Sequence, residues 1–272
     1  MQGTFTEFSQ AWTRALILLI VLVPAGLFMK SLKKIERKDW KWFAILGLAS
    51  LNQAPYYFGF EHLSVGTATL LFYCFLTLGA YLIGALFFKE KMTLPKIFGL
   101  LIASIGLYNI YAFSLESNQV VAAIATSIAG LMGACGVVFS KKVSDRYSEL
   151  QIIVVYGVFI FIGNLAMTLI LGETMPKLAL TSSWLAQLGY ATSFLLANAA
   201  VVAGFRHIEP SVGGVLGLLE VVFAAILGVI IFSESVTLSL LIGEVLIVVG
   251  AVVPSVSSKP SLPPTRPSPA SP

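Results

Sequence analysis

Apolar stretches of about 20 residues follow one another along almost the whole chain, and they limit the fold more than any other feature. The hydrocarbon core of a bilayer is about 30 Å thick and needs about 20 helical residues to cross it. None of the stretches alternates as a strand of a membrane barrel does. The sequence therefore predicts an all-α, polytopic membrane protein with about nine transmembrane helices. The predicted spans are 10–29, 42–60, 64–88, 93–113, 119–140, 150–172, 182–204, 211–232 and 236–254.

Composition agrees with this fold class. Apolar residues make up 57% of the 272 residues and charged residues only 11%, whereas soluble domains carry about 25% charged residues. The chain therefore lacks the polar surface that a water-soluble domain needs. After the last span, residues 255–272 are rich in Ser and Pro, and we expect a disordered tail there.

The basic residues predict the orientation in the membrane. With alternating spans, all of the 17 Lys and Arg residues except Arg14 and Lys177 fall on one side. Because Lys and Arg accumulate in cytoplasmic loops, this side is expected to be cytoplasmic. The C-terminal tail is then cytoplasmic, and we expect an integral protein of the bacterial cytoplasmic (inner) membrane. An external N-terminus follows from nine spans.

Two blocks of sequence recur along the chain. Gly59-Phe60-Glu61-His62 reappears as Gly204-Phe205-Arg206-His207, and Ser-Val-Gly follows shortly after both blocks. Further on, the residues Glu90, Thr93, Leu94, Gly99 and Gly106 recur with identical spacing as Glu234, Thr237, Leu238, Gly243 and Gly250. Matching helices lie five spans apart, so the two copies cross the membrane in opposite directions. This predicts an inverted repeat, with four helices in residues 1–113 and five in residues 119–254.

The unequal halves leave the helix at 119–140 without a partner. We expect that either the start codon is misassigned or the protein is a natural nine-helix variant. A third alternative is that residues 10–29 are a cleaved signal peptide with a weak cleavage site at Val23-Pro24-Ala25. The basic run at 30–41 argues against it, because such a run would be a poor start for a secreted segment.

The chain resembles a known family in its second copy. The segment from Ser211-Val212-Gly213-Gly214 through Leu219-Glu220-Val221-Val222-Phe223 to Ser233-Glu234 resembles the signature of the EamA-type transporters of the drug/metabolite transporter superfamily. Residues 64–90 resemble it more loosely. The resemblance implies ten helices in two inverted halves, a central cavity and a transport function. This chain has one helix fewer, Val221 in place of the usual proline, and Glu244 in place of a small residue.

No pattern in the sequence predicts an enzyme. The two histidines, His62 and His207, fall on opposite sides and are interpreted as helix caps, while Cys74 and Cys135 are interpreted as packing residues. Paired aspartates for a magnesium-bound diphosphate and a GxSxG elbow are missing from the sequence. We expect no catalytic residue, no metal and no cofactor. Nucleic acid is not an expected partner, because the basic residues sit in short loops between apolar spans.

The candidate site consists of polar residues at membrane depth. An ionisable residue near mid-bilayer costs about 2.5–3.5 kcal/mol, so it should face the interior or a water-filled path. Glu220 lies about 14 Å into its span, and the repeat places Tyr73 at the equivalent position and pairs Gln53 with Asn198. An alternative is that these polar groups only form hydrogen bonds between helices. The predicted residues for substrate binding or coupling are Glu220, Tyr73, Gln53, Asn198, Asn52 and Tyr56.

Two functions remain open. The first is a secondary transporter that exports or exchanges an amino acid or a similar polar metabolite through a cavity at the midplane. The second is a truncated, non-transporting paralogue that acts as an assembly partner or is inactive alone. The expected partners are a small-molecule solute and the lipid bilayer, and a homodimer stays open. Glu244 is assigned a structural or oligomer-contact role. Four glycines with a spacing of seven are assigned to close helix packing: Gly99, Gly106, Gly243 and Gly250.

Overall fold

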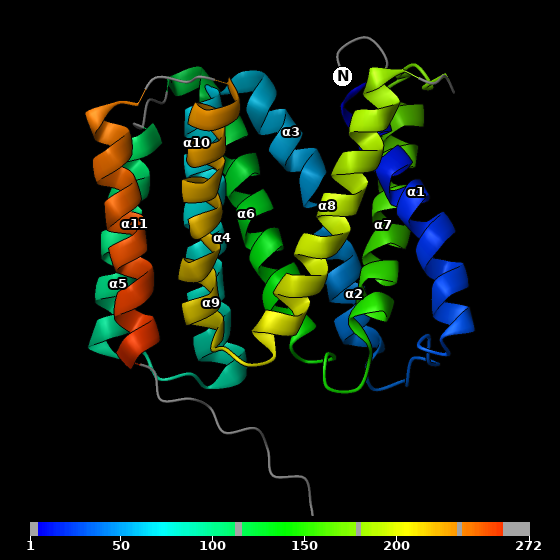
Figure 1. The fold of residues 1–272 in the computed structure, drawn as a ribbon, viewed down its shortest axis with the longest axis horizontal. Coiled ribbons are helices and arrows are strands. Elements are labelled where there is room, and N and C mark those ends of the chain that lie inside the picture. Colours follow the sequence, from blue (N-terminus) through cyan, green and yellow to red (C-terminus); the bar gives the residue numbers. More distant parts are fainter. Residues whose placement is uncertain (1–4, 112–115, 178–180, 233–235, 258–272) are drawn as a thin grey trace, which may run out of the picture.

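All regular secondary structure in the described part of the chain is helical, which confirms the all-α membrane fold. The computed structural model describes residues 5–111, 116–177, 181–232 and 236–257. Figure 1 shows the long helices side by side and roughly parallel or antiparallel. The elements are α1 (Glu7–Phe28), α2 (Trp40–Ala49), η1 (Ser50–Asn52), α3 (Gln53–His62), α4 (Val65–Phe88), α5 (Leu94–Tyr111), η2 (Ser117–Gln119), α6 (Val120–Ser140), α7 (Glu149–Ile170), α8 (Ser182–Phe205), α9 (Pro210–Gly217), α10 (Leu219–Phe232) and α11 (Leu238–Ser257).

Every predicted span has a helical counterpart among the described residues. Five helices are long and apolar enough to cross a membrane: α1, α4, α6 with its η2 turn, α7 and α8. The helices at 94–110, 210–223 and 238–254 are apolar but shorter. Large apolar side chains such as Phe28, Leu86 and Ile170 are exposed on the outside of the bundle, as expected for a surface that faces lipid.

Two spans are interrupted near their middle. The span predicted at 42–60 is divided into α2 and α3 by the 3₁₀ turn η1. Pro55 explains this break, because proline has no N–H to donate to the carbonyl group four residues earlier. The span predicted at 211–232 is divided into α9 and α10 at Leu218, next to Gly217. Bonds of the i to i−3 type join the two parts, from Leu218 N to Val215 O and from Val221 N to Leu218 O, both 3.0 Å long.

Three helix pairs form the framework, and they are α4 with α6, α5 with α11, and α1 with α7. One apolar core lies between α1, α2, α4, α6, α7 and α8, and a second lies between α4, α5, α9, α10 and α11. The helices α1 and α7 pack on the first core, and α5 and α11 pack on the second, so the two pairs lie in opposite parts of the molecule (Figure 1).

The pair of α5 and α11 is held together through glycines. A Cβ atom added at Gly99 would lie 2.6 Å from the carbonyl oxygen of Gly250, and one added at Gly106 would lie 2.6 Å from that of Gly243. Only glycine permits such a close approach of two helix backbones. This confirms that the four glycines serve close helix packing.

One end of the bundle, which we call the basic end, carries the connections 29–39, 89–93, 141–148 and 206–209. Buried Asp39 fixes two of them, because its carboxylate accepts a hydrogen bond from Tyr147 Oη (3.0 Å) and pairs with Arg146. His207 lies at this end and His62 at the other, in agreement with the sequence. The repeat residue Glu234 and the tail from residue 258 lie outside the described residues.

Candidate functional site

A cavity of about 540 Å³ lies at the middle of the helices. This volume falls within the range of about 300–1,000 Å³ that is typical of small-molecule sites. Its walls come from α2, η1, α3, α4, α6, α7, α8 and α10, so both interrupted spans reach it. The lining residues are Ala49, Ser50, Asn52, Gln53, Tyr56, Phe72, Tyr73, Leu76, Gly133, Gly136, Val137, Tyr156, Ile160, Tyr190, Ser193, Phe194, Ala197, Asn198, Val201 and Glu220.

All the candidate residues predicted from the sequence line this one cavity. Asn52, Gln53 and Tyr56 come from the first interrupted span, at and just after its break. Tyr73 comes from α4, Asn198 from α8 and Glu220 from α10. The structure therefore brings the six side chains together, and their role in binding stays a prediction.

Glu220 is the only ionisable carboxyl group among these lining residues. It stands in the first turn of α10, directly after the break at Leu218. The N-terminus of a helix carries a partial positive charge that favours an anionic side chain. Glu220 is exposed to the hollow and has no hydrogen bond or ion pair with another described residue. Its carboxylate is therefore available to a solute or to a proton.

The amide side chains of the cavity differ in their hydrogen bonds. Asn198 Nδ2 donates to the carbonyl oxygen of Phe194 on its own helix (2.9 Å). Gln53 Oε1 is buried and has no hydrogen-bond partner among the described residues. A buried acceptor without a partner is unfavourable unless a water molecule or a ligand donates to it. Gln53 thus adds a second acceptor near the cavity.

Aromatic rings form part of the remaining wall, and four of them were not predicted from the sequence: Phe72, Tyr156, Tyr190 and Phe194. Tyr56 stacks on Phe72 with ring centroids 4.3 Å apart, and Phe72 meets Tyr73 edge-on at 5.3 Å. Tyr156 Oη donates to the carbonyl oxygen of Gly136. Nothing in an apolar span distinguishes a ring that faces a cavity from one that faces lipid, so these rings could not be identified from the sequence.

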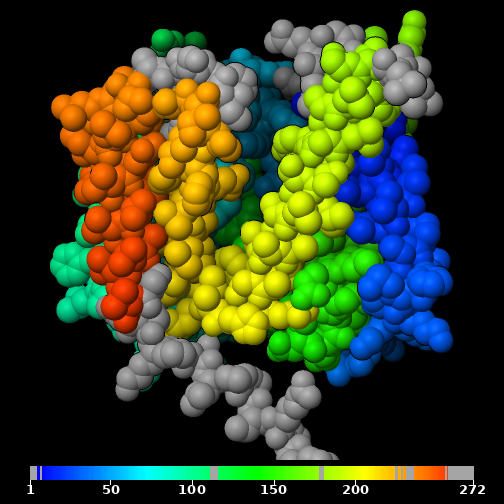
Figure 2. Space-filling view, viewed as in Figure 1, coloured from blue at the N-terminus to red at the C-terminus, as the bar shows by residue number. Residues whose placement is uncertain are grey.

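The cavity opens on one face of the molecule and is covered at the basic end. Figure 2 shows the hollow between α8 (yellow-green) and α10 (gold), with more distant helices visible at its back. The last turn of α8 and the first turn of α9 (yellow) lie across its lower margin. A solute in the cavity is therefore separated from the basic end by the connection between α8 and α9.

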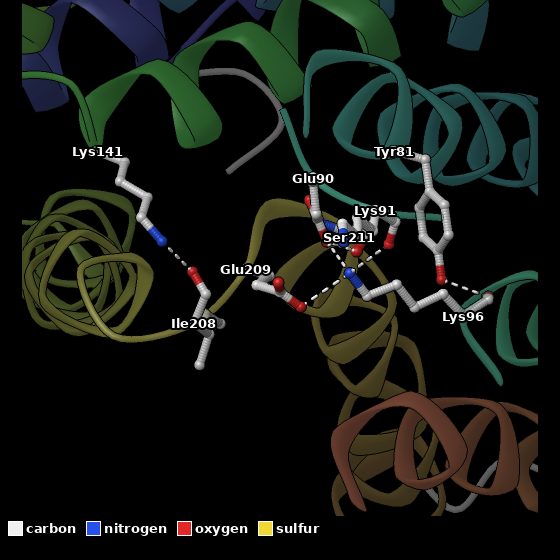
Figure 3. Close-up of polar contacts among 8 residues, drawn as sticks. All are labelled: Tyr81, Glu90, Lys91, Lys96, Lys141, Ile208, Glu209 and Ser211. Carbon is white, nitrogen blue, oxygen red and sulfur yellow. Dashed lines mark hydrogen bonds and ion pairs between the residues drawn. The ribbon is translucent and has the colours of Figure 1, made fainter. Parts of the chain in front are cut away.

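An ion cluster holds this connection in place (Figure 3). We define it as Glu90, Lys96, Glu209 and Ser211. Lys96 Nζ lies 2.6 Å from Glu90 Oε1 and 2.8 Å from Glu209 Oε2. Ser211 donates from its backbone N–H (3.3 Å) and from its hydroxyl group to the Glu90 carboxylate. Lys96 is 4% exposed, so this cation is buried but paired, which compensates much of its desolvation.

Two further cationic side chains, Lys141 and Arg206, also hold the same connection in place. Lys141 Nζ donates to the carbonyl oxygen of Ile208, as Figure 3 shows. Burial lowers the pKa of Lys141, while the nearby carboxylates of Glu90, Glu209 and Asp145 raise it. Arg206 pairs with Glu149 at 2.5 Å and donates to the carbonyl oxygen of Tyr147 (3.2 Å).

The family can be assigned from the sequence as a whole. The family model of the EamA-like transporter family matches residues 1–112 and 120–256, on either side of the connection between α5 and α6. The chain belongs to the EamA-like transporter family. This EamA-like protein is therefore an integral membrane protein of a family of transporters and not of enzymes, and the family resemblance seen in the sequence is confirmed.

A solved structure supports the same fold. The EamA-like protein matches a chain described as "Crystal structure of protein" with a TM-score of 0.80 and 20% sequence identity, over 94% of this chain and 91% of that one. At this identity the match shows the fold alone. The comparison with curated proteins gives no match.

Proposed function

We propose that this EamA-like protein is a secondary transporter that exports or exchanges an amino acid or a similar small polar metabolite. The solute binds in the central cavity, at the level where both interrupted spans reach it. Interrupted helices supply polar groups at membrane depth without exposing backbone to lipid, which is why transporters use them for binding. Secondary transport needs no catalytic residue, metal or cofactor of the protein's own.

The observation that carries this proposal is the carboxylate of Glu220 on the cavity wall, which pairs with none of the described residues. An acid at membrane depth is unfavourable unless a partner or water compensates its charge, so an acid there points to a function. Here it either binds the amino group of the solute or takes up a proton that moves with the transport cycle. Gln53 and Asn198 extend the polar wall, and the aromatic rings surround the less polar part of the solute.

Transport requires that the cavity open to each side in turn. The ion cluster supports a state in which the basic end is closed, because it ties α5 to the start of α9. The reciprocal contacts of α5 with α11 support two halves related by a two-fold axis in the membrane plane. Gly99 contacts Gly250 and Gly106 contacts Gly243, and a two-fold relation between repeat-equivalent residues gives this crosswise pattern. The predicted repeats are 1–113 and 119–254.

The charge distribution supports a cytoplasmic basic end, with the C-terminus on the cytoplasmic side of a bacterial inner membrane. In this orientation, the cavity is closed towards the cytoplasm. An exporter would load its solute after the ion cluster opens, and it would release the solute on the opposite side.

The test is counterflow in proteoliposomes that contain the purified protein and an internal pool of unlabelled amino acids. We expect the wild type to accumulate at least one labelled amino acid. Uptake by Glu220→Gln should be at least about tenfold lower, because one hydrogen bond to a charged group is lost. Glu244→Gln is the matched control, because Glu244 is an intramembrane acid of α11 outside the cavity lining. Wild-type counterflow by Glu220→Gln would refute a role of Glu220 in binding the amino group, whereas a proton-coupling role predicts that this exchange survives. A wild type that takes up no amino acid would refute amino acids as the transported solutes.

One observation favours a second function, that of an assembly partner. Of the five long helices, α8 is the least covered by the rest of the protein. In its apolar stretch 17% is buried, compared with 39–44% in the other four helices. A second protein or a second copy of this chain could cover the open face between α8 and α10. Cross-linking of a cysteine at exposed Leu196 in native membranes distinguishes the two functions, because a monomeric transporter gives no cross-linked product.

A further inference from the structure

The first turns of α1 contain a cation that the proposed function does not use. Arg14 lies seven residues, or about 10 Å, beyond the first residue of α1, and it is only 6% exposed. An arginine at membrane depth is strongly unfavourable unless a partner or water compensates its charge, so such a residue points to a function. Lys96, the other strongly buried cation, has two carboxylates within 3 Å. Arg14 pairs with no carboxylate among the described residues.

Arg14 is held by aromatic rings instead of an acid. Its guanidinium carbon lies 4.2 Å from the ring centroid of Tyr190 and 5.4 Å from that of Phe194. The two rings are four residues apart on α8, so they lie on one face of this helix. Cation–π contacts stabilise a guanidinium group but leave its N–H donors free for an anion. The guanidinium group of Arg14 can therefore still bind an anion.

The rings that hold Arg14 are also walls of the central cavity. Tyr190, Phe194 and Ile160 line the cavity, and Phe194 and Ile160 also line a small void beside Arg14. Tyr190 is 51% exposed, so its side chain can turn without disturbing a packed core. A single layer of side chains therefore separates the guanidinium group from the solute space.

We propose that Arg14 is the group that recognises a carboxylate of the transported solute. This inference rests on the proposed function and specifies its solute class as small molecules with a carboxylate. A planar guanidinium group binds a carboxylate through two parallel hydrogen bonds, which a lysine does not reproduce. With Glu220 as the partner of an amino group, the cavity is suited to a zwitterion such as an amino acid. Among the described residues, no other arginine or lysine lines either cavity.

The test compares each standard L-amino acid with its carboxamide, which keeps the size and the amino group but lacks the negative charge. Affinities come from the rise in unfolding temperature of the purified full-length protein with ligand concentration. We expect the wild type to prefer an amino acid over its amide by at least about tenfold, the effect of one charged hydrogen bond. In Arg14→Gln this ratio should fall to about one. Arg37→Gln, at an exposed position of the basic end, is the control and should keep the wild-type ratio.

The outcomes separate this inference from the proposed function. If amino acids bind and Arg14→Gln keeps the preference, or weakens the acid and the amide equally, then Arg14 is a structural residue and only this inference fails. If no amino acid binds the wild type, the proposed solute class and this inference fail together. Arg14→Lys keeps the positive charge, and it serves as a second variant if Arg14→Gln does not fold. Its ratio should fall between those of the wild type and Arg14→Gln, and an unchanged ratio would overturn the inference.

Discussion

Intramembrane glycines show how much a single atom matters where two helices touch. At Gly106 an added Cβ would meet the carbonyl oxygen of Gly243 at 2.6 Å and the Cβ of Leu246 at 2.9 Å. Neither α5 nor α11 can give way without disturbing the other glycine contacts along the same crossing. We therefore expect this position to tolerate no larger side chain.

Substitution of Gly106 by leucine tests this expectation. Overpacking at a tight contact costs about 1–3 kcal/mol, and we expect Gly106→Leu to lower the free energy of unfolding by this amount. The matched control is Gly189→Leu on α8, because a Cβ there has no neighbour within 4 Å. The measurement is unfolding in mixed micelles of increasing SDS content. Equal midpoints for the two variants would contradict the packing role.

Residue depth was readable from the sequence, whereas residue neighbours were not. Glu220 could be predicted because an acid in the middle of an apolar span needs an explanation, whatever surrounds it. Arg14 lies within the predicted span 10–29 but was not predicted as a site residue, and its contacts with Tyr190 and Phe194 depend on how α1 and α8 are rotated against each other. Helices that are apolar on all sides carry no pattern that fixes this rotation.

Among the elements, the connection between α8 and α9 has the clearest mechanical role. Glu209 of this connection binds Lys96 in the first turn of α5, and Ser211 in the first turn of α9 binds Glu90, which follows α4. Lys96 and Glu90 are almost fully buried, whereas the side chain of Glu209 is 37% exposed. Loss of the Glu209 contact should therefore loosen the closure without unfolding the protein.

Accessibility of a cysteine in the cavity measures this closure. In a variant without Cys74 and Cys135, Ser193→Cys places a thiol on the cavity wall. We expect Glu209→Gln to speed its labelling from the basic side by up to about fivefold, the equivalent of about 1 kcal/mol for a partly exposed ion pair. Glu36→Gln is the control, since it removes the exposed Lys38–Glu36 pair at the same end. Unchanged labelling in Glu209→Gln would show that the ion cluster does not govern access.

The breaks within the spans were not predicted, although their causes stand in the sequence. Pro55 removes one helical hydrogen bond, and Gly217 weakens the helix at the second break. Both residue types are common in transmembrane helices without a break, because neighbouring groups can satisfy the freed backbone atoms. The positions of the spans themselves follow from length and hydropathy alone, and here the sequence was sufficient.

On the scale of the whole molecule, the separation of charge between the two ends determines its orientation. The connections at 29–39 and 141–148 are tied together through Asp39, Arg146 and Tyr147, so the basic end is a structured surface. Because it carries almost all the cationic side chains, we expect it to face the cytoplasm.

Single cysteines at exposed positions of the two ends test the orientation in a variant without native cysteines. We expect Thr174→Cys to react with a membrane-impermeant thiol reagent in intact cells, and Arg37→Cys to react only after the membrane is permeabilised. Both positions are exposed. Reaction of Arg37→Cys in intact cells would reverse the assigned orientation. The inverted relation of the two halves stays a prediction, which rests on the repeat and on the crosswise glycine contacts.

The break at Leu218 also has a consequence for the backbone itself. The first turn of a helix leaves amide groups without acceptors in their own helix, and here that turn begins at membrane depth beside an open cavity. Val221 N is bonded back to Leu218 O, so the amides in question are those of Leu219 and Glu220. In lipid these amides would be isolated, so water in the cavity has to reach them. The amide hydrogens of Leu219 and Glu220 should therefore exchange with deuterium while those of the flanking helical turns stay protected. A patch of fast exchange in the centre of the bilayer would mark the depth to which water penetrates the protein.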